Sequence, residues 1–230
     1  MSASWTRRTF FGAAGAIPSS LAQVPGGSSS PGKTVKIIGV SCSARKDRTT
    51  AAALRICLEA AKEFGPGIEI ELIDLGGLKI NGDLAAGIPL AAGERDDFTQ
   101  IEAKLRAPNV GGIIIGTPVY FSNMSSLCKA FLDRWMAFRG TFALRNKVGG
   151  ALAVGAARNG GQELTLQTMH AAMLCQDMII VSEGKPTSRL GGILVSTKDD
   201  ISKDEVGLAT ARSLGRRVAE LALLLRKAGA

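Results

Sequence analysis

From residue 34 onward, short apolar runs rich in β-branched residues alternate with longer stretches whose apolar positions repeat at helical spacing. Continuous apolar runs are typical of strands that are covered on both faces. They predict five strands, at residues 34–40, 68–75, 110–117, 147–155 and 178–181. The amphipathic stretches predict helices at residues 49–65, 96–106, 124–138, 163–176 and 203–227.

Five strands that alternate with helices predict one α/β domain over residues 34–230, with a doubly wound parallel sheet between two helical layers. Ligands of such sheets bind at the carboxyl ends of the strands, near the point where the strand order reverses. We therefore expect the site in the loops that follow the first, third and fourth strands.

The first 33 residues have a different composition from the rest of the chain. Arg7 and Arg8 precede a short apolar run, and Ser20-Leu21-Ala22 offers a small-residue cleavage site. This pattern resembles a twin-arginine signal over residues 1–22, followed by a Gly/Pro/Ser linker over residues 23–33. It predicts export of the folded protein to the periplasm, and the alternative is a basic tail on a cytoplasmic protein.

The charge of the chain narrows the classes of partner. The 230 residues include 28 Lys and Arg against 20 Asp and Glu, a net charge of +8. These charges are scattered and lack aromatic interleaving, which disfavours nucleic acid and favours small anionic ligands. The apolar run near the N-terminus is far shorter than the roughly 20 residues that span a bilayer, so we expect no integral membrane span.

The cysteines and the single histidine give little support for a metal site. Cys42, Cys57, Cys128 and Cys175 are widely spaced and form no CxxC pair. Cys57, Cys128 and Cys175 are predicted to be small core residues, whereas Cys42 lies in a loop of interest. His170 lies in a helical pattern and is predicted to be a packed or surface residue rather than a catalytic one.

The loop after the first strand, SCSARKDRTT, combines hydroxyl groups with cations immediately before a helix. Free N–H groups at a helix N-terminus, with hydroxyls and cations nearby, form a phosphate socket. The loop is neither a Walker motif nor a G-x-G-x-x-G motif, and a solvated turn is the alternative. The candidate phosphate ligands are Ser41, Ser43, Arg45, Arg48, Thr49 and Thr50.

The loop after the third strand, GTPVYFSNM, places large planar side chains where loops normally have small polar ones. Pro118 fixes the backbone as it leaves the strand, while Tyr120 and Phe121 supply flat apolar surface. A helix start with a hydrophobic staple is the alternative interpretation. The candidate binding residues are Thr117, Pro118, Val119, Tyr120, Phe121, Asn123 and Met124.

The loop after the fourth strand, GAARNGGQE, contains paired glycines that permit close approach of the backbone to a ligand. The candidate binding residues in it are Arg158, Gly160, Gly161 and Gln162. Together the three loops offer a phosphate clamp and two walls for a flat polar ring. A mononucleotide would fill such a site.

In this order and on these strands, the three loops resemble those of the flavodoxin-like NAD(P)H-dependent FMN reductases and the related iron-sulfur flavoproteins. The likeness covers residues 34–230, and GTPVYFSNMS…KAFLDR is its most specific motif. In the phosphate loop, Ser43, Arg45 and Thr50 match the family pattern G-S-P-R-x-x-G-N-T. Ala44, Arg48 and Thr49 depart from it at the proline, glycine and asparagine positions.

The resemblance implies a flavodoxin-like five-stranded sheet of order 2-1-3-4-5 with FMN as the cofactor. It implies hydride transfer from NADPH or NADH to FMN and onward transfer to a quinone or a similar small acceptor, in a homodimer or homotetramer. An FMN-binding electron carrier is the alternative, although such carriers are typically acidic. A periplasmic location would require a donor other than NAD(P)H.

The iron-sulfur branch of the family carries a cysteine cluster after the second strand. Residues 76–93 of this chain contain no cysteine, so flavin is predicted to be the sole redox centre, and the segment is predicted to cover the flavin or contact a subunit. Because the flavin carries the chemistry, the resemblance implies no catalytic side chain. Asp133 and Arg134 are predicted to form a solvated or interface pair.

Overall fold

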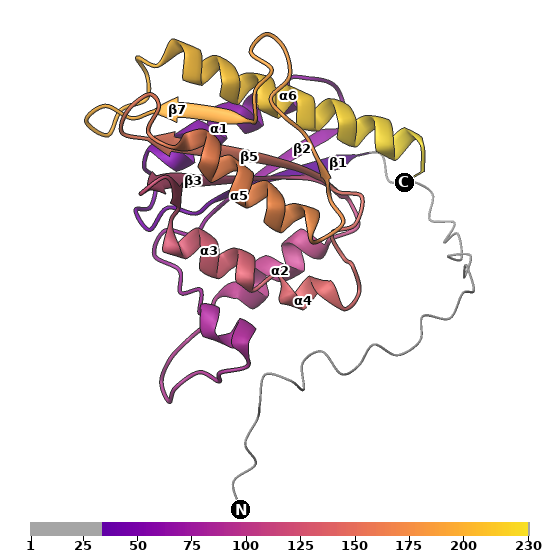
Figure 1. Cartoon of the computed structure of the whole chain (residues 1–230). Coiled ribbons are helices and arrows are strands. Elements are labelled where there is room, and N and C mark those ends of the chain that lie inside the picture. Colours follow the sequence, from indigo (N-terminus) through magenta and orange to yellow (C-terminus); the bar gives the residue numbers. More distant parts are fainter. Residues whose placement is uncertain (1–33, 230) are drawn as a thin grey trace, which may run out of the picture. The chain divides into compact units, whose positions relative to one another are not determined.

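The computed structural model describes residues 34–229 (Figure 1). The segments predicted to be a signal (1–22) and a linker (23–33) lie outside the described residues, and both assignments stay predictions. The strands are β1 (Val35–Ser41), β2 (Ile68–Asp74), β3 (Val110–Tyr120), β4 (Asn123–Met124), β5 (Val148–Gly155), β6 (Ile179–Ile180) and β7 (Gly192–Val195). The helices are α1 (Thr49–Lys62), α2 (Phe98–Arg106), α3 (Ser126–Asp133), α4 (Met136–Arg139), α5 (Gln162–Leu174) and α6 (Glu205–Lys227), with a 3-10 turn η2 (Gly82–Ala86).

The sheet has the predicted flavodoxin-like order, β2-β1-β3-β5-β6, and its main strands pair in parallel. The predicted count of five strands is wrong, because the described residues form seven. β4 pairs antiparallel with the end of β3. The predicted fifth strand at 178–181 is shortened to β6, which pairs with the start of β5, and the unpredicted β7 pairs with the end of β5. The loop between β6 and β7 interrupts this edge position.

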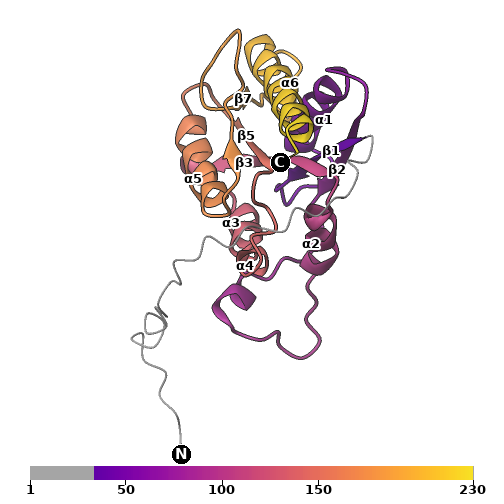
Figure 2. The same cartoon turned by 90° about the vertical axis from the view of Figure 1, so that its right-hand side faces the viewer.

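Helices cover both faces of the sheet, as Figures 1 and 2 show. α1 and α6 pack together on one face, over a core that includes Leu54, Leu58 and Val218. Their close crossing depends on Gly215, since a Cβ there would lie 1.8 Å from the carbonyl oxygen of Cys57. α2, α3 and α5 bury a second core on the other face, which includes Phe98.

The predicted helix at 124–138 is interrupted in the structure. Ser125 caps α3, because its hydroxyl accepts the N–H of Cys128 at 3.1 Å. α3 ends at Asp133, and α4 begins at Met136 after the buried Trp135, whose indole ring contacts Phe131 and Phe138 edge-on. Aromatic packing therefore decides where the chain changes direction.

Two sequence predictions about single side chains are wrong. Arg134 does not pair with Asp133 in solvent; it is largely buried and donates to Asp96 Oδ1 at 2.5 Å, over the ring of Phe98. Asp133 instead pairs with Lys129 one helical turn earlier. Cys175 is exposed rather than buried, and it caps the C-terminus of α5.

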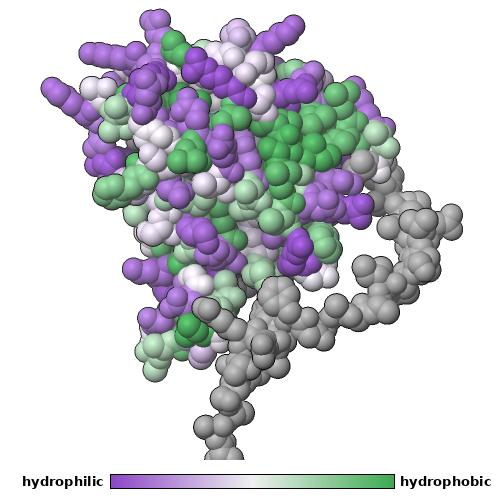
Figure 3. Space-filling model, in the orientation of Figure 1, coloured by the Kyte–Doolittle hydropathy of each residue, from purple (hydrophilic) through white to green (hydrophobic). Residues whose placement is uncertain are grey.

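The surface is mixed in character. Apolar surface gathers over the C-terminal part of α6, where Leu224 is exposed (Figure 3). Within residues 34–229, none of the helices combines the length and the hydropathy needed to cross a bilayer.

Candidate functional site

The strand register brings the three predicted loops to one edge of the sheet. Ser41 at the end of β1 pairs with Gly116, and Pro118 in β3 pairs with Val154 near the end of β5. The segments that follow β1, β3 and β5 therefore leave the sheet side by side, at its carboxyl edge. This is the position at which doubly wound sheets bind their ligands.

The N-terminus of α1 has unused hydrogen-bonding capacity. The N–H groups of Thr49, Thr50 and Ala51 donate to no other described residue, and Arg48 provides no side-chain cap. The first turn contains no acidic residue, and its two threonines are buried. Such an end carries a partial positive charge and favours an anion.

Ser41 adds a second unsatisfied group at the same edge. Its side chain is completely buried, and its hydroxyl has no hydrogen-bond partner among the described residues. A buried polar group without a partner costs free energy, so a ligand that supplies the partner is favoured. Ser41 and the start of α1 are thus suited to a phosphate-bearing ligand.

Of the remaining predicted phosphate ligands, Ser43 and Arg45 have partners within the protein and the Arg48 side chain has none among the described residues. The Ser43 hydroxyl accepts the N–H of Arg45 and donates to its carbonyl, both at 3.2 Å, which closes a tight turn. The Arg45 guanidinium lies 2.8 Å from the Asp199 carboxylate, with both side chains about half exposed. Arg48 is exposed and has no described ion pair. Because exposed pairs contribute little, Arg45 can exchange Asp199 for a phosphate at low cost.

Two residues that sequence reasoning missed support this loop from β2. The Asp74 carboxylate accepts the N–H of Asp47 at 2.8 Å and the N–H of Gly76 at 3.1 Å. Gly76 packs directly on the loop, since a Cβ there would lie 2.5 Å from both N and Cα of Lys46. The paired glycines after β2 were the available signal, but their contact arises only in the folded chain.

The loop between β3 and β4 presents the predicted flat apolar surface. Tyr120 is 53% exposed and Phe121 is fully exposed. Phe121 and Ser122 have positive φ angles of 50° and 59°, which reverse the chain into β4. Non-glycine residues in this conformation are uncommon and occur often at binding sites.

The other predicted residues of this loop differ in accessibility. Pro118, Val119 and Met124 are partly buried. Thr117 is completely buried, and its hydroxyl accepts the N–H of Ser125 at 3.1 Å, so it positions the start of α3. Asn123 is exposed, and its Oδ1 accepts both the N–H of Met124 and the hydroxyl of Thr168 on α5.

The loop after β5 is held by its own glutamine. Gln162 is completely buried; its amide nitrogen donates to the Ala157 carbonyl at 2.7 Å and its oxygen accepts the N–H of Gly160 at 2.8 Å. Gly161 has a φ of 97°, and a Cβ there would lie 2.4 Å from Ser122 Oγ. The second and third loops are therefore in contact, and Gln162 fixes the backbone of the third loop.

Arg158, in the same loop, makes contact with the start of α6. Its guanidinium donates to the largely buried Asp204, which also caps α6 by accepting the N–H of Gly207 at 3.0 Å. It thus ties the third loop to the start of α6. Its predicted contact with a cofactor stays a prediction.

Cys42, which follows β1, and His170 of α5 form no acid–base pair within residues 34–229. Burial raises the pKa of the Cys42 thiol, with a further contribution from the neighbouring Cys128. His170 lies on α5, half-buried, and burial lowers its pKa. Both groups are neutral at pH 7, and neither pairs with a carboxylate among the described residues.

The NADPH-dependent FMN reductase family model matches residues 35–189 of this chain. The chain belongs to this family. An iron-sulfur flavoprotein of Methanocaldococcus jannaschii is 41% identical over 197 residues, which cover 84% of this chain and all of that protein. An NAD(P)H dehydrogenase (quinone) of Paracoccus denitrificans is 35% identical over 127 residues, 52% of this chain and 55% of that protein.

Solved structures show the same fold. A WrbA-like flavodoxin from Agrobacterium tumefaciens superposes with a TM-score of 0.58 at 21% identity, over 83% of this chain and 98% of that one. At this level of identity, the likeness establishes the flavodoxin-like architecture and not the substrate.

The residues present fit the FMN of the family. The open N-terminus of α1 and the unsatisfied Ser41 hydroxyl suit its phosphate, while the exposed Tyr120 offers a flat apolar surface to its ring. This protein is therefore an FMN-binding oxidoreductase of the family.

The described residues do not fit an iron-sulfur cluster, the group after which the iron-sulfur flavoproteins are named. No group of three or more Cys, His, Asp or Glu side chains converges as metal ligands within residues 34–229. Residues 76–93 contain no cysteine and form a loop with η2, whose Gly82 packs against Ala130 of α3. That flavin is the sole redox centre stays a prediction.

Proposed function

We propose that this protein passes an electron pair from NADPH or NADH, or from another donor if the protein is exported, through FMN to a quinone or a similar small acceptor. The observation that carries the proposal is the meeting of three loops at the carboxyl edge of the sheet, with an uncapped helix N-terminus and an exposed aromatic pair. Membership of the FMN reductase family and the likeness to a quinone-dependent dehydrogenase support it.

Bound FMN supplies the redox chemistry of the proposed reaction. The protein's own groups bind and orient the reactants. The N–H groups of Thr49 and Thr50, with the hydroxyl of Ser41, are placed to bind the phosphate. Tyr120 offers its exposed face to the ring, and Gln162 fixes the third loop from within. No side chain at this edge is needed as an acid or base.

The decisive experiment is anaerobic reduction. The purified protein is expected to be yellow, to release FMN on denaturation, to bleach with NADPH or NADH, and to regain its colour with a soluble quinone. A protein that folds and refuses FMN would contradict the site. A protein that binds FMN and is not reduced by either nucleotide would contradict the donor.

An FMN-binding electron carrier is the second candidate. The basic composition favours the reductase, since flavodoxin-type carriers are typically acidic. Steady-state turnover separates the two: a reductase consumes NADPH in the presence of quinone alone, whereas a carrier requires a separate reductase protein.

The cellular location is part of this proposal. We infer from Arg7, Arg8 and the Ser20-Leu21-Ala22 site that the protein is exported by the twin-arginine route. The mature protein would begin near Gln23 and would then use a quinol or a redox protein as donor, because NAD(P)H is a cytoplasmic reagent. N-terminal sequencing of the protein from fractionated cells tests this, and an intact Met1 in the cytoplasm would refute it.

The exposed aromatic loop also supports self-association. Tyr120, Phe121 and Leu132 line a cavity of about 690 Å³ between the β3–β4 hairpin, α3 and α5. We propose that a second copy covers this surface in a homodimer or homotetramer, because several apolar side chains adjoin one another around this cavity, and apolar patches mark protein interfaces. Phe121→Ser is expected to shift the protein toward monomer in analytical ultracentrifugation, and an unchanged mass would argue against this surface.

A further inference from the structure

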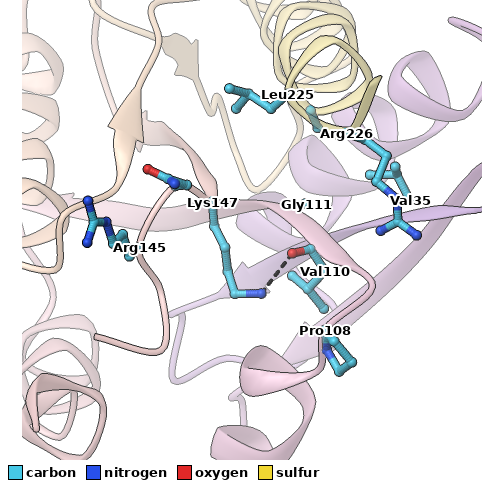
Figure 4. A pocket seen from close by; sticks show the side chains of 10 residues that line it. Val35, Pro108, Val110, Gly111, Arg145, Lys147, Leu225 and Arg226 are labelled. Atoms are coloured by element: carbon cyan, nitrogen blue, oxygen red, sulfur yellow. Dashed lines mark hydrogen bonds between the residues drawn. The ribbon is translucent and has the colours of Figure 1, made fainter. Parts of the chain in front are cut away.

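A small cavity lies at the opposite edge of the sheet from the FMN site. It has a volume of about 140 Å³ and lies among the beginnings of β1 and β3, the residues before β5, and the last turns of α6 (Figure 4). Its lining is Val35, Pro108, Val110, Gly111, Arg145, Asn146, Lys147, Ala222, Leu225 and Arg226. The volume is well above the roughly 10–15 Å³ that a single water requires.

Lys147 is the central group of this cavity. It is only 9% exposed, and its Nζ donates to the Val110 carbonyl at 2.8 Å and to the Ala107 carbonyl at 3.1 Å. Figure 4 shows its side chain descending from the start of β5 toward Val110. An ammonium group has three N–H donors, so one donor has no partner among residues 34–229.

The positive charge of Lys147 lacks a carboxylate partner in the part of the chain that is described. None of the ten lining residues is acidic. Asp177, the nearby carboxylate, pairs with Arg145 at 3.2 Å instead. Burial lowers the pKa of Lys147 to about 8, which leaves it mostly protonated at pH 7. A buried charge without a counterion is costly, so an anion in the cavity would be stabilising.

Two further cations border the same space. Arg145 is exposed beside Asp177, and Arg226 enters from α6 (Figure 4). The guanidinium of Arg226 makes an interaction of its own, so the argument depends on Lys147 and on the shape of the cavity. The apolar walls, Val35 and Leu225 among them, strengthen an ionic contact by lowering the local dielectric constant.

We propose that this cavity binds a small oxyanion, such as inorganic phosphate, through the third N–H of Lys147. The cavity differs from the FMN site in position and in every lining residue, and it is independent of the proposed reaction. The matching chemistry is a compact anion that accepts several hydrogen bonds and replaces water in the cavity.

The test uses the full-length protein loaded with FMN, so that the phosphate socket at α1 is already filled. Proton–nitrogen NMR correlation spectra of the lysine ammonium groups are recorded while inorganic phosphate is added at constant ionic strength. The Lys147 signal is expected to shift and saturate at millimolar phosphate, and chloride at equal ionic strength is expected not to shift it. Absence of a saturable shift would overturn the proposal.

A matched pair of variants assigns the site. Lys147→Met removes the buried charge, whereas Lys62→Met removes the charge of an exposed lysine in the last turn of α1. Calorimetry of the FMN-loaded proteins is expected to show phosphate binding in wild type and Lys62→Met, and its loss in Lys147→Met. Equal binding in both variants would assign the anion to the surface and refute the cavity. Should Lys147→Met fail to fold, the wild-type spectra decide alone.

A second titration separates two sources of the same chemistry. Adenosine monophosphate presents a phosphoryl group attached to a bulky nucleoside. A Lys147 shift with inorganic phosphate alone identifies a free anion as the ligand. A shift with both compounds shows that the cavity also accepts the phosphoryl group of a larger molecule.

Discussion

Replacement of Gly76 by alanine tests the inference that β2 supports the phosphate loop. A methyl group at Gly76 would lie 2.5 Å from the backbone N and Cα of Lys46, where ordinary contact begins at 3.4 Å. The backbone cannot rotate away as a flexible side chain would, so the loop must retreat by about 0.9 Å, the difference of these two distances. Overpacking of this kind costs about 1–3 kcal/mol.

The displacement acts on FMN through hydrogen-bond geometry. The N–H groups that bind phosphate work at donor–acceptor distances of about 2.7–3.2 Å, so a shift approaching 1 Å removes at least one bond. A hydrogen bond to a charged group contributes about 1.5–3 kcal/mol, which corresponds to a roughly 10- to 150-fold weaker Kd for FMN. The assay is quenching of FMN fluorescence on titration with the apoprotein.

Gly77→Ala is the matched control. Gly77 has a φ of 83°, so alanine strains its backbone, but nothing lies within 4 Å of the added methyl group. This variant is expected to lose about 1–2 kcal/mol of stability while keeping wild-type affinity for FMN. Folding is checked by circular dichroism and thermal unfolding. Wild-type FMN affinity in folded Gly76→Ala, or an equal loss in Gly77→Ala, would refute the reasoning.

Three further predictions concern single charged side chains. Arg45→Ala is expected to weaken FMN binding about tenfold in the same quenching assay, because the variant loses one charged hydrogen bond. Unchanged affinity for FMN would show that Arg45 does not bind the phosphate. Arg134→Met leaves the buried Asp96 without its cation, and we expect it to lower the free energy of unfolding in urea by about 3–5 kcal/mol. The control, Lys129→Met, breaks an exposed pair and should lower it by less than about 1 kcal/mol. Equal losses of stability in the two variants would contradict the buried pairing. The pKa of Lys147 is about 8 in the folded protein, against an ordinary value of 10.5. Between pH 8 and pH 10.5 the unfolded chain therefore binds more protons at Lys147 than the folded protein does. The free energy of unfolding contributed by this residue rises with pH over that range. Relative to Lys147→Met, the wild-type free energy of unfolding should increase by up to about 3 kcal/mol from pH 8 to 10.5, and parallel pH profiles would refute the low pKa.

Much of the candidate site could be predicted because its signals are local in sequence. Hydroxyls and cations before a helix, as in SCSARKDRTT, indicate an anion site wherever the helix packs. Parallel strands bring their carboxyl ends to one edge, so the loops after β1, β3 and β5 could be expected together. The roles within each loop could not be assigned in this way. Thr117 and Gln162 carry suitable polar groups, yet both are used to hold the backbone.

The errors at the sheet edge and in the third helix have a common physical origin. Residues 178–181 have the apolar pattern of a full strand, but only two of them pair with β5, and Gly192–Val195 occupies the rest of that edge position. Residues 124–138 read as one amphipathic helix, whereas the buried Trp135 packs edge-on against Phe131 and Phe138 where the chain leaves α3. In both places tertiary packing overrides local preference.

The amino-acid sequence by itself determined the α/β class and the sheet edge at which the three candidate loops meet, because apolar periodicity and loop chemistry act over a few residues, and the strand order followed from the family resemblance. Only the tertiary structure decided which groups lie next to one another across long separations. It places Gly76 on Lys46, Arg134 on Asp96, and the Lys147 ammonium beside the Val110 carbonyl, with no carboxylate partner among the described residues. Such contacts depend on the packing of distant elements, and no pattern along the chain encodes them.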